Sequence, residues 1–294
     1  MLIMRVAIKT VLRSCLMVCV LSTTVSGQVI FQNDFDQHSR SIDYTRSELD
    51  KGWNEPTWEN GVDEGRVRIV SGEKAYGQKG SALAVSYPSG TFGTKQSGAQ
   101  WILKLGHEYE EATLKYRIKF ESGFDFVRGG KLPGLAGGNT PTGSDPVNGV
   151  DGWSARFMWK TDKPRLPGSS RRLTAYPISY AKYLKSGKKK DGSQADRAIW
   201  YDSNRNRSVF KSGVWYSIRQ RVKMNDPGVA NGVFQIWLNE QLVLDQQDRL
   251  VRLTPKLKID SMYFSTFFGG GDKQWATSKD ETIYFDDFEI TASE

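Results

Sequence analysis

The sequence YRIKFESGFDFVRGGKLPGL, residues 116–135, decides the fold that this chain is predicted to adopt. Apolar and charged residues alternate over residues 114–120, which is the pattern of a strand with one buried face. A Gly-Gly pair directly before Lys131 and a Pro-Gly pair just after it then interrupt the pattern. Because glycine permits unusual backbone angles and close approach, we expect a stiff loop that holds Lys131. The stretch therefore predicts a strand followed by a cationic loop.

Residues 153–159, WSARFMW, predict a second strand beside this loop. If its aromatic residues point into the core, then Ser154, Arg156 and Met158 point to the opposite side. We therefore expect Lys131, Ser154 and Arg156 to line one groove. On the charge pattern alone, Lys131 reads equally well as a solvated lysine. In the same way, Arg156 reads as half of a cross-strand ion pair and Ser154 as an ordinary polar residue.

The rest of the chain alternates short strands with glycine-rich turns. Further strands are predicted at residues 29–35, 67–70, 82–87, 213–223, 232–239, 241–244, 262–268 and 282–290. The first and last of these are expected to pair, and a hairpin turn is expected at Asn239-Glu240. No run of ten or more residues keeps a helical period. The sequence thus predicts an all-β fold, a β-jelly roll that is a two-sheet antiparallel sandwich of the concanavalin-like kind, with a concave groove.

Residues 1–27 have the pattern of a secretory signal peptide. Basic residues precede an apolar run, and small residues follow it near Gly27. Both cysteines of the chain, Cys15 and Cys19, lie inside this segment, so we expect a mature protein without disulfides or cysteine metal sites. We expect residues 28–294 to form a single domain in a secreted or periplasmic protein.

The charge and the aromatic content point to an acidic polymer as partner. The formal net charge is +8, and loss of the three basic residues of the leader leaves +5. Nine tryptophans and twelve tyrosines offer rings on which sugars stack. We expect no nucleic-acid partner, because the protein is predicted to be exported. We expect no membrane partner, because no second apolar segment reaches the ~20 residues of a membrane span. Residues 182–207 form a basic segment whose role the sequence leaves open.

The chemistry that suits such a groove is β-elimination on a polymer of uronic acids. Elimination needs a cation that neutralises the carboxylate, a base for the C5 proton and an acid for the leaving oxygen. Arg156 or Lys131 fits the first role. Tyr176, with a pKa depressed by these cations, is the best-placed candidate for both proton transfers, and Tyr180 stands behind it. The alternative for Tyr176 is an interfacial tyrosine with a buried ring.

Other catalytic patterns are missing from the sequence. His38 and His107 are the only histidines, they lie far apart, and no cluster has the spacing of metal ligands. The Glu-x-Asp-x-x-Glu arrangement expected of a glycosidase on this architecture is missing as well. We therefore expect no metal and no cofactor.

Several of these motifs resemble polysaccharide lyase family 14. The resemblance lies in residues 119–135, 153–159 and 264–270, and also in 97–101, 231–237 and Trp275. It implies a jelly-roll enzyme that cleaves alginate or glucuronan by β-elimination without a metal. It places the groove lysine at Lys131 and the Ser-x-Arg pair at Ser154 and Arg156. We further expect Gln100, Lys95, Arg128 and Tyr180 to contact the substrate.

The resemblance also implies a Tyr-x-Tyr pair, of which this sequence has only Tyr176 in Thr174-Ala-Tyr176. Either Tyr176 takes the acid and base role, or the basic segment supplies Tyr180. We expect a monomeric polyuronate lyase whose partner is its acidic polysaccharide. The alternative, favoured by the missing second tyrosine, is a non-catalytic module that binds acidic polysaccharides.

Overall fold

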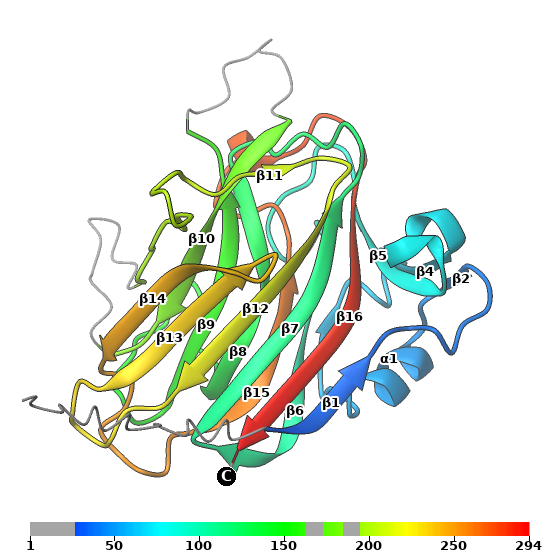
Figure 1. The fold of residues 1–294 in the computed structure, drawn as a ribbon. Coiled ribbons are helices and arrows are strands. Elements are labelled where there is room, and N and C mark those ends of the chain that lie inside the picture. Colours follow the sequence, from blue (N-terminus) through cyan, green and yellow to red (C-terminus); the bar gives the residue numbers. More distant parts are fainter. Residues whose placement is uncertain (1–26, 163–172, 185–194, 294) are drawn as a thin grey trace, which may run out of the picture.

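The computed structural model describes residues 27–162, 173–184 and 195–293, which form two antiparallel sheets. Figure 1 shows these sheets packed face to face as a sandwich. The predicted all-β sandwich is therefore confirmed. The predicted signal segment up to residue 26 and residues 185–194 of the basic segment lie outside the described residues.

The larger sheet has nine strands. In spatial order they are β14 (Gln241–Arg249), β13 (Gly232–Leu238), β12 (Trp215–Lys223), β7 (Glu111–Phe120), β16 (Glu281–Ser293), β5 (Ser81–Tyr87), β4 (Val67–Ser71) and β2 (Ile42–Asp43), with β1 (Gln28–Asn33) paired to β16. The predicted pairing of the first and last strands is confirmed, since Phe31 lies opposite Ile290.

The smaller sheet has seven strands and carries the candidate site. In spatial order they are β11 (Phe210–Lys211), β10 (Thr174–Lys182), β9 (Gly152–Lys160), β8 (Gly129–Gly138), β15 (Ile259–Thr266), β6 (Ala99–Tyr109) and β3 (Glu59–Asn60). One face of this sheet packs on the larger sheet, and the other face is the outer face of the sandwich.

The helical elements are short. They are α1 (Arg46–Gly52) and the 3-10 turns η1 (Gly72–Lys74), η2 (Tyr76–Gln78) and η3 (Lys273–Trp275). The side chain of Thr45 caps α1 by accepting a hydrogen bond from the Glu48 amide. The sequence pattern missed α1 because seven residues are too few to display a period of 3.6. Within the described ranges, no helix is long and apolar enough to cross a membrane.

An aromatic core fills the space between the sheets. The alternation predicted for β7 is confirmed, because every second residue from Ala112 to Phe120 is buried. The rings of Trp101 and Phe264 stack with their centroids 3.9 Å apart, and Trp53 meets Trp101 edge-on at 5.1 Å. Such stacked and edge-on contacts add stability beyond the area that the rings bury. The core thereby fixes β15 and β6, which carry one side of the site.

The hairpin between β13 and β14 turns at the predicted position. Asn239 and Glu240 have φ angles of 50° and 63°. Positive φ at both central residues is the mark of the turn type whose twist matches that of the flanking strands.

The predicted loop around Lys131 is a strand in the structure, which corrects the sequence analysis. β8 lies between β9 and β15, Lys131 is opposite Met158, and its amide donates to the Phe267 carbonyl at 2.9 Å. A side chain at Gly130 would overlap the Trp159 ring and the Phe267 carbonyl. The glycine therefore serves close packing inside a sheet, whereas the sequence analysis interpreted it as a loop residue.

Candidate active site

A groove lies on the outer face of the seven-stranded sheet. Along β9, Phe157 and Trp159 belong to the core, while Arg156, Met158 and Lys160 line a cavity of about 730 Å³. The alternation predicted for this strand is therefore confirmed. The cavity is lined by Thr94, Gln100, Lys131, Thr142, Gly143, Arg156, Met158, Lys160, Tyr180, Arg197, Tyr263, Phe267, Gly269, Gly270, Gly271 and Trp275.

Lys131 occupies the floor of this cavity. Its Nζ lies 2.7 Å from the centroid of the Tyr180 ring and 3.1 Å from the Met158 sulfur. Burial lowers the pKa of the Lys131 side chain well below its usual range, and neighbouring cations lower it further. These cations belong to Arg156, Arg197, Lys160 and Lys182. The surroundings therefore favour the neutral amine, which is able to accept a proton.

Arg156 lies beside Lys131 and is almost completely buried. Its Nη1 donates to the Ser265 hydroxyl at 3.0 Å, and its Cζ lies 4.6 Å from the Tyr263 ring centroid. Its Nε has no hydrogen-bond partner among the described residues. A buried guanidinium with an unused donor is chemically suited to pair with a carboxylate.

The lining of the cavity is strongly biased towards positive charge. Four of its sixteen residues are Lys or Arg, and none of the sixteen is Asp or Glu. Gln100 accepts a hydrogen bond from the Tyr263 hydroxyl at 2.9 Å, so its amide nitrogen remains the donor end of that side chain. A groove with this charge attracts a polyanion and concentrates it near the sheet.

An aromatic rim stands at one side of the groove. Two cations lie close to the Trp275 ring, with the Arg128 Cζ 5.1 Å and the Lys160 Nζ 5.0 Å from its centroid. Arg128 also donates to Gln274 at 2.8 Å. The neighbouring Gly270 has a φ of 140°, and a side chain there would overlap the Trp275 indole. The rim thus presents an indole that suits contact with a sugar ring.

The structure brings four of the eight predicted site residues together in the cavity: Lys131, Arg156, Gln100 and Tyr180. Arg128 lies near the ring of Trp275 but is not among the lining residues. Lys95 is exposed beside Thr94 and is not among the lining residues. Ser154 is fully buried, and its hydroxyl donates to the Pro141 carbonyl at 2.8 Å.

Tyr176 lies in a different cavity, of about 270 Å³. Its ring is 4.2 Å from the Arg207 guanidinium, and Arg207 pairs with Asp162. Burial and then Asp162 raise the pKa of Tyr176, while Arg207 opposes them. The expectation that cations depress the pKa of Tyr176 is therefore wrong.

Comparison of the sequence with protein-family profiles identifies its family. The profile described as Polysaccharide lyase 14 matches residues 75–288. The chain belongs to polysaccharide lyase family 14. A comparison with curated protein sequences found no match.

Solved structures share the fold of this family 14 chain. The alginate lyase Aly36B is 22% identical over 90% of this chain and 98% of its own, with a TM-score of 0.69. The family 14 alginate lyase of Aplysia kurodai is also 22% identical, over 90% of this chain and all of its own, with a TM-score of 0.68. The endo-β-1,4-glucuronan lyase of the fungus Trichoderma reesei is 11% identical over 87% of this chain and 95% of its own, with a TM-score of 0.50.

Sequence reasoning missed several lining residues of the family 14 chain. Lys160 follows Arg156 at the same strand period, so extending the predicted strand by one residue finds it. Tyr263 lies in a predicted strand whose outer face was not assigned. Arg197 belongs to the basic segment, whose described residues 195–201 pair with β10 through Asp196 and Ile199. Among the described residues, no three His, Cys, Asp or Glu side chains gather as a metal site.

Proposed function

We propose that this chain is a secreted lyase that cleaves a polyuronate, alginate or glucuronan, by β-elimination. The observation that carries the proposal is the buried Lys131, whose pKa is lowered, beside Tyr180 and Arg156 in a groove whose described lining residues include no carboxylate. The named activities of Aly36B and the Aplysia and Trichoderma enzymes support this class of substrate. The leader pattern of residues 1–27 supports secretion.

Arg156 is the residue that holds the uronate carboxylate. Its position between the Tyr263 ring and Ser265 fixes the guanidinium, and its Nε faces no other partner in the described chain. Hydrogen bonds to the carboxylate stabilise the negative charge that moves onto it when the C5 proton leaves. Gln100 is placed to add an amide donor at the same end of the groove.

Lys131 is the base in this proposal. The neutral amine takes the C5 proton, and the electron pair of the C5–H bond forms the C4–C5 double bond while the C4–O bond breaks. The role differs from the one that the sequence analysis gave to Lys131, which was to neutralise the carboxylate. Burial and the four neighbouring cations are the reason for the change, because they disfavour an ammonium at this position.

Tyr180 is the acid. Its ring contacts Lys131, and it lies directly opposite Arg156 in the pairing of β10 with β9. Its hydroxyl gives a proton to the leaving oxygen, and the ammonium formed on Lys131 returns a proton to the tyrosinate. The products are a chain with a free hydroxyl and a chain with a 4,5-unsaturated uronate end. Of the two tyrosines left open by the sequence, the proposal takes Tyr180.

Incubation of the purified protein with a panel of polyuronates tests the proposal. The unsaturated product absorbs near ~235 nm, so absorbance should rise with alginate or with glucuronan, and Lys131→Ala should abolish the rise. Binding of a polyuronate without any rise in absorbance would replace the proposal with a non-catalytic binding module. The panel also identifies the polymer that is cleaved.

A further inference from the structure

Two buried side chains on neighbouring strands donate hydrogen bonds to the same loop beside the groove. Ser154 of β9 lies opposite Lys182 of β10. The Ser154 hydroxyl donates to the Pro141 carbonyl at 2.8 Å. The Lys182 ammonium donates to the Gly143 carbonyl at 2.9 Å and to the Asp145 carbonyl at 2.7 Å. Both side chains are fully buried, so these carbonyls are their contacts in place of water.

The residues that accept these hydrogen bonds lie in a hydrogen-bonded turn, residues 141–145, at the wall of the cavity. The Asp145 amide donates to the Thr142 carbonyl at 2.8 Å, and the Asp145 carboxylate accepts from the Thr142 amide at 2.7 Å. Thr142 and Gly143 line the cavity, whereas neither Ser154 nor Lys182 does. The two strands therefore act on the groove through this turn.

The surroundings of Lys182 disfavour its positive charge. Burial lowers the pKa of its ammonium, Arg156 and Arg197 lower it as well, and Asp145 raises it. A cation beside two other cations is stable only where strong acceptors face it. The carbonyls of Gly143 and Asp145, together with the Asp145 carboxylate, supply that compensation.

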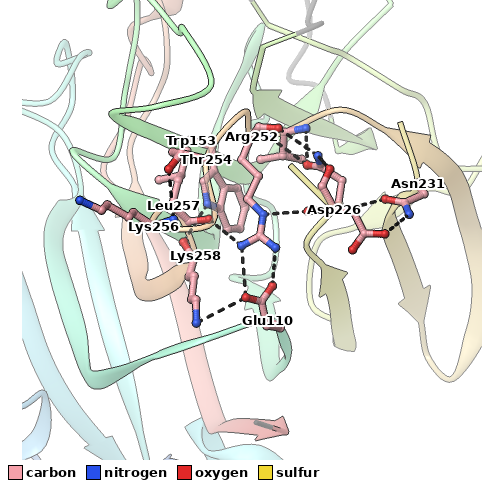
Figure 2. Close-up of polar contacts among 11 residues, drawn as sticks. Glu110, Trp153, Asp226, Asn231, Arg252, Thr254, Lys256, Leu257 and Lys258 are labelled. Carbon is pink, nitrogen blue, oxygen red and sulfur yellow. Dashed lines mark hydrogen bonds and ion pairs between the residues drawn. The ribbon is translucent and has the colours of Figure 1, made fainter. Parts of the chain in front are cut away.

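A second network fixes the other end of the loop over residues 139–151. The Leu253 amide donates to the Gly149 carbonyl at 2.7 Å. Figure 2 shows the neighbouring Arg252, which donates to the Leu257 carbonyl and pairs with Glu110, at 3.0 Å and 2.6 Å. The Gly149 end of the loop is therefore held by the segment between β14 and β15, and the turn at residues 141–145 is held by Ser154 and Lys182.

We propose that Ser154 and Lys182 are positioning residues that form a clasp on residues 141–145 and so set one wall of the substrate groove. The inference rests on the proposed function for its kinetic part, because the wall matters only if a polyuronate lies against it. It assigns Ser154 a task away from the reacting atoms, in contrast to the catalytic role predicted from the sequence. It also gives a function to Lys182, which the sequence analysis did not single out.

Three variants test the clasp: Ser154→Ala, Lys182→Met and the double variant. Hydrogen exchange of the Thr142 and Asp145 amides is measured first, without substrate, so that its outcome is independent of whether the protein is a lyase. Ser154→Ala should speed this exchange by about tenfold, the effect expected from loss of one buried hydrogen bond, and Lys182→Met, which removes two, should speed it at least as much. Lys223→Met, on the larger sheet and exposed, controls for loss of a lysine charge.

The kinetic readout separates positioning from catalysis. At a pH above the Lys131 pKa of every variant, each single variant should raise KM by about tenfold and leave kcat within about twofold, because the turn lines the groove and moves no proton. At lower pH, Lys182→Met should also slow the reaction, since Lys182 is one of the cations that lower the Lys131 pKa. Ser154→Ala changes no charge, so a rise in KM shared with Lys182→Met is not a loss of electrostatic attraction. The double variant should be no worse than the worse single variant, since both act through one turn. A Ser154→Ala variant with lowered kcat, unchanged KM and unchanged exchange would overturn the proposal and return Ser154 to the reacting centre.

Discussion

Nζ of Lys131 lies over the face of the Tyr180 ring, 2.7 Å from its centroid. The two residues come from β8 and β10, the strands on either side of β9, so their side chains meet above Arg156 and Met158. In the proposed mechanism, the base and the acid therefore approach the sugar from the same side. A single face of attack is what β-elimination needs when the C5 proton and the leaving oxygen lie on that face.

Tyr180→Phe should remove the acid while keeping the ring that packs on Lys131. We expect the elimination rate to fall by about 10²–10³, because one transition-state proton donor is lost, and oligosaccharide binding to stay nearly unchanged. Absorbance of the unsaturated product measures the rate, and calorimetry measures binding. Tyr176→Phe should have much the smaller effect; a larger loss in Tyr176→Phe than in Tyr180→Phe would move the acid to the second cavity.

The pH profile should report the ionisation of Lys131. The neutral amine is the active form, so kcat/KM should rise with pH through the Lys131 pKa and level off above it. Because the pKa of Lys131 is lowered, the rise of kcat/KM should be complete at a pH well below ~10.4, the pKa of an ordinary lysine side chain.

Arg197→Gln should move this rise to higher pH. Arg197 is one of the cations that lower the pKa of Lys131, so its removal makes the ammonium easier to form. The midpoint of the kcat/KM profile is the measurement. Arg207→Gln, outside the groove, is the matched control and should leave the midpoint in place. If the midpoint of the profile is the same in Arg197→Gln as in the unchanged protein, a group other than Lys131 controls the profile.

Asp286 should make the folded protein less stable as pH rises from about 4 to about 7. Burial is the main cause that raises the pKa of Asp286 to about 7, from an ordinary value of 3.8. Between these values the folded state holds a proton that the unfolded state has released, so the free energy of unfolding falls as pH increases. Asp286→Asn should flatten this slope in urea titrations across the same range. Asp43→Asn, an exposed carboxylate, should leave it unchanged.

Arg252→Met should lower the free energy of unfolding by about 2–4 kcal/mol, since it leaves buried carbonyls without donors. Figure 2 shows the contacts of the guanidinium with Glu110 and Leu257, and its Nε also donates to the Asn225 carbonyl at 2.7 Å. Urea titration measures the change. Arg68→Met removes an exposed pair with Asp43 and should cost less than about 1 kcal/mol. Equal effects of the two variants would contradict the structural role of Arg252.

The sandwich and its strands could be predicted from the sequence because period-two alternation records burial on one face, as in β7 and β9. The glycines around Lys131 led to the wrong prediction of a loop where the structure has strand β8. In β8 the glycines mark close contact inside the sheet, and the ring of Trp159, which requires Gly130, comes from another strand. A contact between strands leaves no trace in the local pattern of either.

The choice between the two tyrosines shows the same limit. Tyr176 and Tyr180 are four residues apart on β10, so both project from one face. Strand spacing separates them by about 13 Å, enough to put one beside Lys160 and the other beside Arg156. Periodicity assigns a face, whereas the position along the strand depends on the register with β9, which the sequence did not reveal.

The close packing of β8 also governs how mutational scans of this enzyme should be interpreted. Side chains at Gly130 and Gly134 would overlap the carbonyls of Phe267 and Ala155, which belong to the neighbouring chain segments on either side. In a saturation library both positions should therefore appear as indispensable as Lys131, although neither glycine is among the residues that line the cavity. Sorting that library by solubility before activity would separate the two kinds of intolerance, because only the glycine variants should be lost at the first sort.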